Sequence, residues 1–236
     1  MHLPFNFQLI ENGWEAATLK RVIREYEASL PDFGWPNWVI GSHDAPRIAA
    51  RVGEAQARVA AMLLLTLRGT PTLYQGDELG IGEVPIPPDR IRDPQHQRQP
   101  HLNIGRDRSR TPMPWDDGDH AGFSSVEPWL PLNPDWRTRN VAAQEGDPAS
   151  MLSLYRRLLS LRRAEPALAV GAFDLLEAPE GVLAYSRKEG ERTLRILLNL
   201  TDQPRTIEWS GDVLLSTLDA CPQPGSLQPN EGLILA

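Results

Sequence analysis

The first eighty residues alternate between short apolar runs and longer segments in which apolar residues recur at helical spacing. A short run that is apolar throughout is typical of a strand buried on both faces, and the helical recurrence is typical of a helix with one charged face. This pattern predicts strands at 3–10, 37–41 and 70–76 and helices at 14–30 and 54–69. Strands and helices in this alternating order predict parallel α/β structure.

The segment from residue 80 to 147 shows almost no such period. It is rich in Pro, Asp, Arg and Trp, and a nonperiodic segment of this length inside a compact protein is usually functional. We expect an ordered excursion over the surface. A helix is predicted to follow at 147–166, with Asp147 as its N-cap, Pro148 at its first position and Pro166 just beyond its end.

From residue 167 onward the apolar residues recur with a period of two. Short strands separated by turn residues are typical of a small antiparallel β domain. We therefore predict an α/β region at 1–165 followed by an all-β domain at 166–236. The strands predicted in the second region are 181–188, 193–201, 205–210, 212–217 and 231–236.

Composition and charge narrow the classes of function. The 236 residues are 41% hydrophobic, which is enough to build a core, and the net charge of −7 with scattered arginines argues against nucleic acid or an anionic membrane as a partner. The single cysteine, Cys221, allows no internal disulfide framework. The first residues, MHLPFNFQLIENGWE, lack the pattern of a signal peptide, and the apolar stretch 59–67 is about half as long as a membrane span. We expect a cytoplasmic protein.

The residues that follow the predicted strands are candidates for chemistry, because the carboxyl ends of parallel strands converge on the active site of such folds. His43 and Asp44 follow the second strand, and Asp77 and Glu78 follow the third. Glycoside hydrolysis needs two carboxyl groups about 5 to 10 Å apart, one to protonate the leaving oxygen and one to attack or to activate water. Asp44 and Glu78 are therefore a candidate pair.

Each of these side chains also has a purely structural interpretation. An Asp at a strand end is commonly an N-cap or a turn former, and Glu78 in YQGDELG is expected to order its own turn. Arg47 could pair with a nearby carboxylate as well as contact a ligand. Three tryptophans of the long segment could form a sugar-stacking wall or simply pack the loop, and these are Trp115, Trp129 and Trp136.

Several motifs, taken in order, resemble the alpha-amylase family of glycoside hydrolases, in particular its bacterial exo-acting alpha-glucosidase and oligo-1,6-glucosidase branch. GSHDAPR at 41–47 resembles the NHD motif after the seventh barrel strand, and GTPTLYQGDELG at 69–80 resembles the GxPxxYxGxE motif at the eighth. GRDRSRTPMPWDD with AGFS and PWLPLN resembles the loop that follows, and LPFNFQLI resembles the sixth strand. The resemblance implies the last three βα units of a TIM (β/α)8 barrel, strands six to eight, followed by an antiparallel β-sandwich.

The resemblance also implies roles for individual residues. Asp44 matches the carboxylate that stabilises the oxocarbenium-like transition state, and His43 matches the histidine that hydrogen-bonds the sugar undergoing cleavage. Arg110 resembles the arginine that grips the non-reducing-end sugar and makes the enzyme exo-acting. Arg47 is expected to support the Asp44 loop, and Glu78 to be structural. No cofactor is implied, and the absence of calcium-ligand spacing predicts no metal.

Two departures from the family pattern are visible. Ser42 stands where the motif usually has Asn, and either side chain can hydrogen-bond locally. The second departure concerns the family's nucleophilic aspartate, in a GFRxD motif, its general-acid glutamate and its first-strand NH motif, none of which has a counterpart in this sequence. We therefore expect Met1 to fall in the middle of a longer protein, the chain to be inactive alone, and the missing N-terminal half of the barrel to be its partner.

Three functions stay open. The first is the C-terminal portion of a retaining, exo-acting alpha-glucosidase that hydrolyses α-1,4 or α-1,6 bonds of oligosaccharides. The second is a fragment of a trehalose synthase-like glucosyl isomerase or transglycosylase. The third is a non-catalytic, amylase-like interaction protein.

Overall fold

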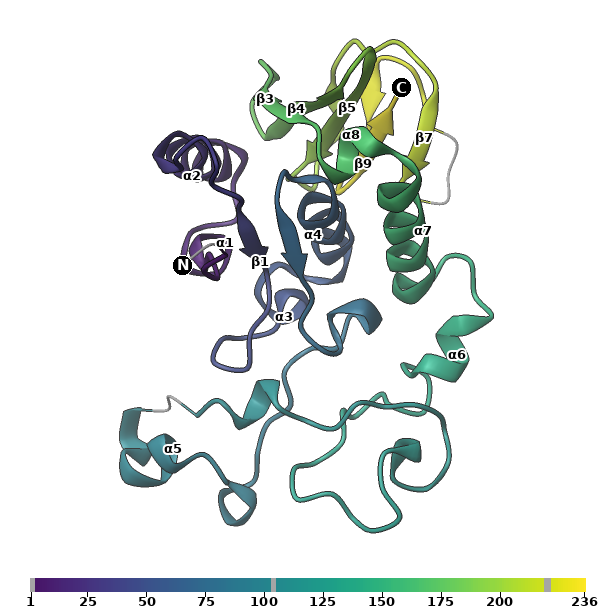
Figure 1. Ribbon diagram of the computed structural model, residues 1–236. Helices are drawn as coiled ribbons and strands as arrows, with labels where there is room; N and C mark the ends of the chain where they lie inside the picture. The colour runs from purple at the N-terminus through teal and green to yellow at the C-terminus, as the bar shows by residue number, and fades with distance from the viewer. Residues whose placement is uncertain (1–2, 103–104, 219–221) are drawn as a thin grey trace. The chain divides into compact units, whose positions relative to one another are not determined.

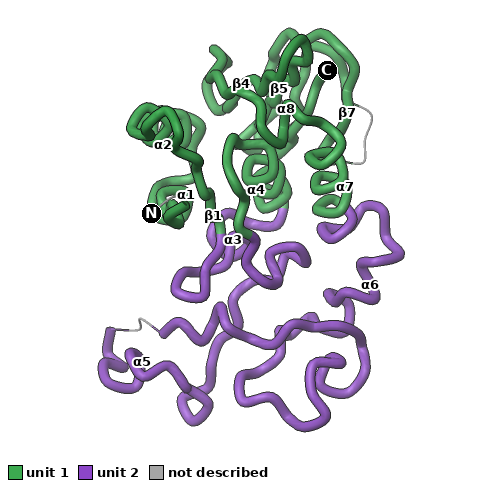
Figure 2. The backbone as a smooth tube through the Cα atoms, in the orientation of Figure 1, with its two compact units in different colours: residues 1–40, 55–72, 154–236 green, residues 41–54, 73–153 purple. Residues whose placement is uncertain are grey.

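The computed structural model describes residues 3–102, 105–218 and 222–236, so that Cys221 lies outside the described residues. The chain forms two compact units (Figure 2). Unit 1 comprises Met1–Ile40, Ala55–Thr72 and Leu154–Ala236, and unit 2 comprises Gly41–Glu54 and Leu73–Ser153. None of the boundaries between the two units coincides with the predicted domain boundary between residues 165 and 166. That domain boundary stays a prediction.

Unit 1 opens with a parallel pair of strands and two helices (Figure 1). β1 (Asn37–Val39) pairs in parallel with β2 (Thr70–Thr72). The helix α2 (Ala16–Ser29) buries one apolar face, whereas α4 (Glu54–Thr66) is buried at every position from Val59 to Thr66. A helix that is apolar nearly all round must be covered on all sides. The predicted parallel α/β structure is confirmed for these elements.

The predicted strand at 3–10 is wrong over most of its length. Asn6 alone forms an isolated parallel bridge to Trp38, and the short helix α1 (Gln8–Glu11) follows at once. The side chain of Asn6 accepts the N–H of Gln8 at 2.9 Å, which turns the backbone into the helix. A helix of four residues is too short to show a helical period in the sequence. The apolar run at 3–10, which overlaps this helix, therefore resembles a strand.

Unit 2 consists of turns and short helices. The absence of a hydrophobic period in most of its sequence predicted this irregular structure. A small apolar cluster of Leu79, Ile81 and Leu152 is buried within it. Its α-helices are α3 (Ile48–Val52), α5 (Pro94–Arg98) and α6 (Val141–Glu145). Its 3-10 helices are Asp77–Leu79, Pro88–Arg90, Pro100–Leu102, Asp107–Ser109 and Asp119–Gly122.

The helix α7 (Met151–Ala164) begins later than predicted. Asp147 does not cap it, because its Oδ1 accepts a backbone N–H two residues on, in the preceding turn. Ser150 caps the helix instead, since its Oγ accepts the N–H of Ser153 at 3.1 Å. Pro166 ends the predicted helix and opens the next one, α8 (Pro166–Ala169).

The C-terminal part of unit 1 is antiparallel β structure, as predicted (Figure 1). Five strands form one sheet in the order β3-β4-β5-β9-β7, and β6 pairs with β8 in a second sheet. The period-two pattern indicated all of these except β3 and β8, which are only four and two residues long. The strands are β3 (Ala172–Leu175), β4 (Val182–Glu189), β5 (Arg192–Asn199), β6 (Arg205–Thr206), β7 (Val213–Ser216), β8 (Ser226–Leu227) and β9 (Gly232–Leu235).

The two sheets share one apolar cluster. Its buried members are Ala184, Leu197, Leu227, Leu233 and Leu235. Leu227 comes from the small sheet and the others come from the large one. This shared core is what the all-β prediction requires of two packed layers.

Two buried arginines bind the carboxyl end of α4 in unit 1. Arg187 is 0% exposed and donates to the carbonyls of Thr66 at 2.5 Å and Gly171 at 2.9 Å. Arg162 donates to the carbonyls of Leu65 at 2.8 Å and Gly69 at 2.6 Å. The last carbonyls of a helix lack partners and carry the negative end of its dipole, so a guanidinium suits them. Burial lowers the pKa of Arg187 to about 10, and the side chain stays cationic at neutral pH.

None of the described helices combines the length and the hydropathy that a membrane span requires.

Candidate functional site

The loop between β1 and α3 carries His43 and Asp44. β1 ends at Val39 and α3 begins at Ile48. The Oγ of Ser42 accepts the N–H of Asp44 at 3.1 Å, so Ser42 makes the local hydrogen bond expected of it. The side chains of His43 and Asp44 are 64% and 50% exposed, whereas Val39 is buried. The chain therefore passes from core to surface within a few residues, and its polar side chains stand at the strand's carboxyl end.

One oxygen of Asp44 accepts from two arginines and lies beside an imidazole nitrogen. Its Oδ1 lies 2.8 Å from Nη2 of Arg110, 3.1 Å from Nη1 of Arg106 and 3.2 Å from Nε2 of His43. Arg110 also donates through Nε to the carbonyl of His43 at 2.9 Å. The structure thus brings three of the predicted site residues together. Over the described part of the chain no donor reaches Oδ2, so that oxygen is the one open to a ligand.

Arg106 is the residue of this group that the sequence did not reveal. A bidentate ion pair fixes it: Asp93 accepts from Nη2 at 2.7 Å through Oδ1 and from Nε at 2.9 Å through Oδ2. Asp93 is 1% exposed, and the Arg106 guanidinium holds the pKa of that carboxyl well below its usual range. The two residues are thirteen positions apart in a segment without period, so only a search for opposite charges could have paired them.

A second buried carboxylate orders the backbone beside this pair. Asp107 is 4% exposed, and its Oδ2 accepts the consecutive N–H groups of Arg92 at 2.6 Å and Asp93 at 2.7 Å. The neighbouring Ser109 donates its hydroxyl to the carbonyl of Ala45 at 2.7 Å. The long segment is therefore tied both to itself and to the Asp44 loop.

Arg47 and Glu78 take no part in this exposed group. Arg47 is 0% exposed, donates through Nη1 to the carbonyl of Gln75 and lies over the ring of Tyr74, 5.2 Å from its centroid. The Oε2 of Glu78 accepts the N–H of Gly76 at 2.7 Å and so orders its own turn. The candidate Asp44–Glu78 pair therefore has Glu78 engaged in a structural hydrogen bond.

The three tryptophans of the long segment differ in their surroundings. Trp136 is stacked by Arg137, whose guanidinium carbon lies 4.2 Å from the ring centroid. Trp115 and Trp129 are 51% and 75% exposed. Trp129 lines a hollow of about 540 Å³ that Arg110 also borders. The remaining lining residues are Arg92, Asp107, Pro112, Phe123, Pro128 and Leu130.

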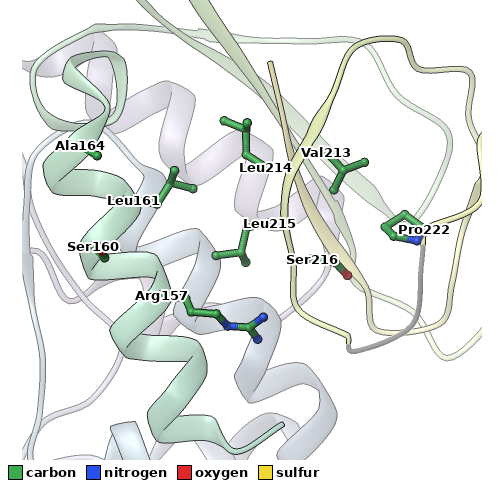
Figure 3. Close-up of a pocket in the computed structure, with 9 residues that line it drawn as sticks. All are labelled: Arg157, Ser160, Leu161, Ala164, Val213, Leu214, Leu215, Ser216 and Pro222. Carbon is green, nitrogen blue, oxygen red and sulfur yellow. The ribbon is translucent and has the colours of Figure 1, made fainter. Parts of the chain in front are cut away.

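A hollow of about 550 Å³ in unit 1 has a different character (Figure 3). It lies between α7, which contributes Arg157, Ser160, Leu161 and Ala164, and β7, with Pro222 at its edge. Its described lining holds neither a carboxyl nor an imidazole group, which acid–base chemistry on a sugar would need. In the described part of the chain, no three His, Cys, Asp or Glu side chains gather as a metal site. The group around Asp44 is therefore the candidate site.

Comparison with known families agrees with these motifs and their geometry. The family described as "Alpha amylase, catalytic domain" matches residues 4–171, more than half of the chain. The chain belongs to the alpha-amylase family.

Curated alpha-amylase relatives are glucosidases by name. A "Probable alpha-glucosidase" of Rhizobium meliloti (strain 1021) is 39% identical over 216 residues, which cover 88% of this chain and 39% of that protein. An "Oligo-1,6-glucosidase" of Parageobacillus thermoglucosidasius is 30% identical over 229 residues, covering 86% of this chain and 41% of that protein. The chain thus spans about two fifths of the length of these relatives.

Solved structures of the same family share the fold. The trehalulose synthase MutB from Pseudomonas mesoacidophila MX-45 is 29% identical and matches 100% of this chain and 50% of its own, with a TM-score of 0.88. A MutB mutant in complex with the substrate sucrose matches with a TM-score of 0.89. The alpha-glucosyl transfer enzyme XgtA is 31% identical, covers 100% of this chain and 46% of its own, and also has a TM-score of 0.89.

Proposed function

We propose that this chain is the C-terminal portion of a retaining, exo-acting alpha-glucosidase that acts on oligosaccharides. In this proposal residues 1–165 supply strands six to eight of the (β/α)8 barrel and 166–236 form the β-sandwich. The names of the curated relatives support a glucosidase. The observation that carries the proposal is the Asp44 carboxylate, which stands at a strand's carboxyl end with one oxygen held by cations and the other open.

Asp44 would stabilise positive charge as it develops on the sugar ring. A carboxylate that is already fixed in place pays no reorganisation energy when the transition state forms. Two arginines on Oδ1 fix the group but also draw on its charge. Sugar hydroxyls are good partners for a guanidinium, so we propose that Arg110 shifts toward the substrate when it binds, while Asp93 keeps Arg106 in place.

His43 would donate to a sugar hydroxyl from the same loop. Its Nε2 lies 3.2 Å from Asp44, and its side chain is more exposed than that of Asp44. Arg47 would act only through the loop, because it is fully buried. The nucleophile and the general acid would come from chain that this sequence does not contain, so that the whole activity needs a partner.

The exposed apolar residues support a partner that carries the rest of the barrel. In unit 1, Phe5 is 57% and Phe33 is 81% exposed, and in unit 2 Trp129 is 75% exposed. A contiguous exposed apolar patch commonly marks a protein interface, and Phe5 lies beside the exposed Phe7, with their ring centroids 6.1 Å apart. A two-stranded parallel pair also leaves unpaired strand edges, which further strands of a barrel would cover.

Complementation tests this proposal. The chain is purified alone and together with the N-terminal part of a homologous alpha-glucosidase, and hydrolysis of p-nitrophenyl α-glucoside is measured. We expect no turnover from the chain alone and turnover from the mixture, with a loss of at least about 100-fold in kcat for Asp44→Asn. Turnover by the chain alone that requires Asp44 would contradict the proposal and favour a second carboxylate within the chain.

The structural neighbours favour one alternative, a glucosyl isomerase or transglycosylase. They include a trehalulose synthase and an alpha-glucosyl transfer enzyme. The two functions differ in whether water or a sugar hydroxyl accepts the glucosyl group. Product analysis of the complemented mixture with sucrose or maltose distinguishes them, because glucose release indicates hydrolysis and a new disaccharide indicates transfer. A complemented mixture that binds but converts no glucoside would favour a non-catalytic interaction protein.

A further inference from the structure

The loop from Gly41 to Arg47 has its first residue packed against a buried carboxylate. Asp77 begins the turn that follows β2 and is 1% exposed. A Cβ placed on Gly41 would lie 2.1 Å from Oδ2 of Asp77 and 3.0 Å from its Cγ. Real Cβ atoms do not approach other atoms this closely, so a glycine is needed at position 41 for the loop to leave the strand here.

The last residue of the loop, Arg47, interacts electrostatically with the same carboxylate. Arg47 is completely buried, and its guanidinium and that of Arg51 in α3 both act on Asp77. Burial raises the pKa of Asp77 to about 7, the two arginines lower it, and the adjacent Glu78 raises it. The other titratable groups that face Arg47 are Tyr74, Glu78 and Glu83.

These buried groups have few alternative partners. Both carboxylate oxygens of Asp77, and Nε and Nη2 of Arg47, are buried without a hydrogen-bond partner in the described parts of the chain. Nη1 of Arg47 donates to the carbonyl of Gln75, and a Cβ on Gly76 would approach this nitrogen to 2.7 Å. A buried charge that lacks compensation is strongly destabilising. The guanidinium of Arg47 is thus held by the backbone of Gln75 and Gly76, directly before Asp77.

We propose that Asp77 is a positioning residue for Asp44. It contacts the first residue of the loop directly, and the turn that it opens binds the last residue, Arg47, through the carbonyl of Gln75. In this way it sets the direction in which His43 and Asp44 face. The catalytic role of Asp44 rests on the proposed function, whereas the contacts of Asp77 are independent of that function. The tests below therefore measure the loop itself and require no turnover.

The first test replaces the charge and keeps the shape. Asp77→Asn is compared with Glu83→Gln, which removes another negative charge that faces Arg47 without touching Gly41. Backbone amide resonances of residues 42–45 are recorded by NMR on the full chain. We expect their shifts to change several-fold more in Asp77→Asn than in Glu83→Gln. Equal changes in the two variants would mean that Asp77 contributes only general charge, and the proposal would fail.

The second test addresses the contact with Gly41. Gly41→Ala forces a methyl group onto the Asp77 carboxylate, and Asp77→Ala removes that carboxylate. If the contact positions the loop, the double variant Gly41→Ala/Asp77→Ala melts at a higher temperature than the sum of the two single shifts predicts. Additive shifts would show that the two residues do not touch in solution, which would overturn the proposal.

The third test needs no change at Asp77 and so applies even if its variants do not fold. In the variant His43→Gln, which removes the neighbouring imidazole, the amides of residues 42–45 are followed between pH 5 and pH 9 together with Cγ of Asp77. We expect these amides to move with the midpoint of Asp77. Amides that stay constant while Cγ titrates would contradict the positioning role.

Discussion

Two pairs of arginines, one pair in each compact unit, bind different kinds of acceptor. In unit 1 the buried Arg162 and Arg187 donate to backbone carbonyls at the end of a helix. In unit 2 Arg106 and Arg110 are partly exposed and donate to carboxylates. The two arginines of unit 1 thereby stabilise a regular, apolar fold. The two arginines of unit 2 fix loops that have little regular structure of their own.

The difference shows how a chemically active surface can be ordered without a large core. Apolar burial and hydrogen-bonded ladders hold the strands and helices of unit 1. Within unit 2, charged side chains that are themselves anchored replace much of that packing, as Asp93 anchors Arg106. Ordered charges are also what recognition of a polar ligand requires, so in unit 2 the contacts that stabilise the loops are close to those that would bind substrate.

The largest expected effect tests the carbonyl-binding arginines of unit 1. Arg187→Met should lower the free energy of unfolding by about 4 kcal/mol, because buried carbonyls lose their donors. The control Arg192→Met removes the exposed pair with Glu165 and should cost much less, because solvent screens the pair. Urea unfolding measures both. Similar losses in the two variants would show that carbonyl binding by a buried guanidinium does not stabilise unit 1 more than an exposed ion pair does.

The next effect concerns the pH dependence of unit 2. The pKa of Asp77 is raised by burial to about 7, against about 3.9 in an unfolded chain, so the folded state binds an extra proton between these values. Stability from this group is therefore present below about pH 4 and is lost as the pH rises through 7. Relative to wild type, Asp77→Asn should gain about 3 kcal/mol between pH 4 and pH 8. Urea unfolding at a series of pH values tests this, and a difference that does not vary with pH would contradict it.

A smaller effect on stability is expected at Asp93, with a pH dependence opposite to that of Asp77. Its pKa is lowered, chiefly by the hydrogen bonds from Arg106, so its stabilising contribution is present above about pH 4 and is lost as the pH falls further. Asp93→Asn should lower the urea midpoint at pH 7 by an amount that shrinks in acid. Asp116, which is half-buried, accepts a backbone N–H from Gly118, so Asp116→Asn is the matched control. If the Asp93 variant shows the same loss at pH 7 and pH 3, its charge is not what matters.

The smallest effect is expected at the exposed indole of unit 2. Trp129→Ala should change the stability of the chain by less than about 0.5 kcal/mol, since the side chain is 75% exposed. The same variant should weaken binding of the N-terminal part of the barrel if that part covers the indole. Calorimetric titration measures this, with Trp115→Ala as the control. A large loss of stability in Trp129→Ala alone would show that the indole is packed within the chain.

The regular elements could be predicted because their physical cause is local. The apolar faces of α2, β1 and α4 are visible as periods in the sequence, and so are most C-terminal strands. His43 and Asp44 could be found because they directly follow a buried strand. Asp93 and Arg106 could not, because their pairing joins distant positions of a segment without period. The apolar run at 3–10 resembled a strand, but only Asn6 found a partner.

The division between the units falls at residues 40 and 72, directly after β1 and β2. Substitutions at exposed positions between residues 73 and 153 can therefore alter recognition with little change in stability. Changes at the buried carboxylates of this segment, Asp77 and Asp93, alter stability as well. A graft of this segment from a homologue should carry the homologue's preference with it, provided that the acidic anchors of its arginines are transferred too.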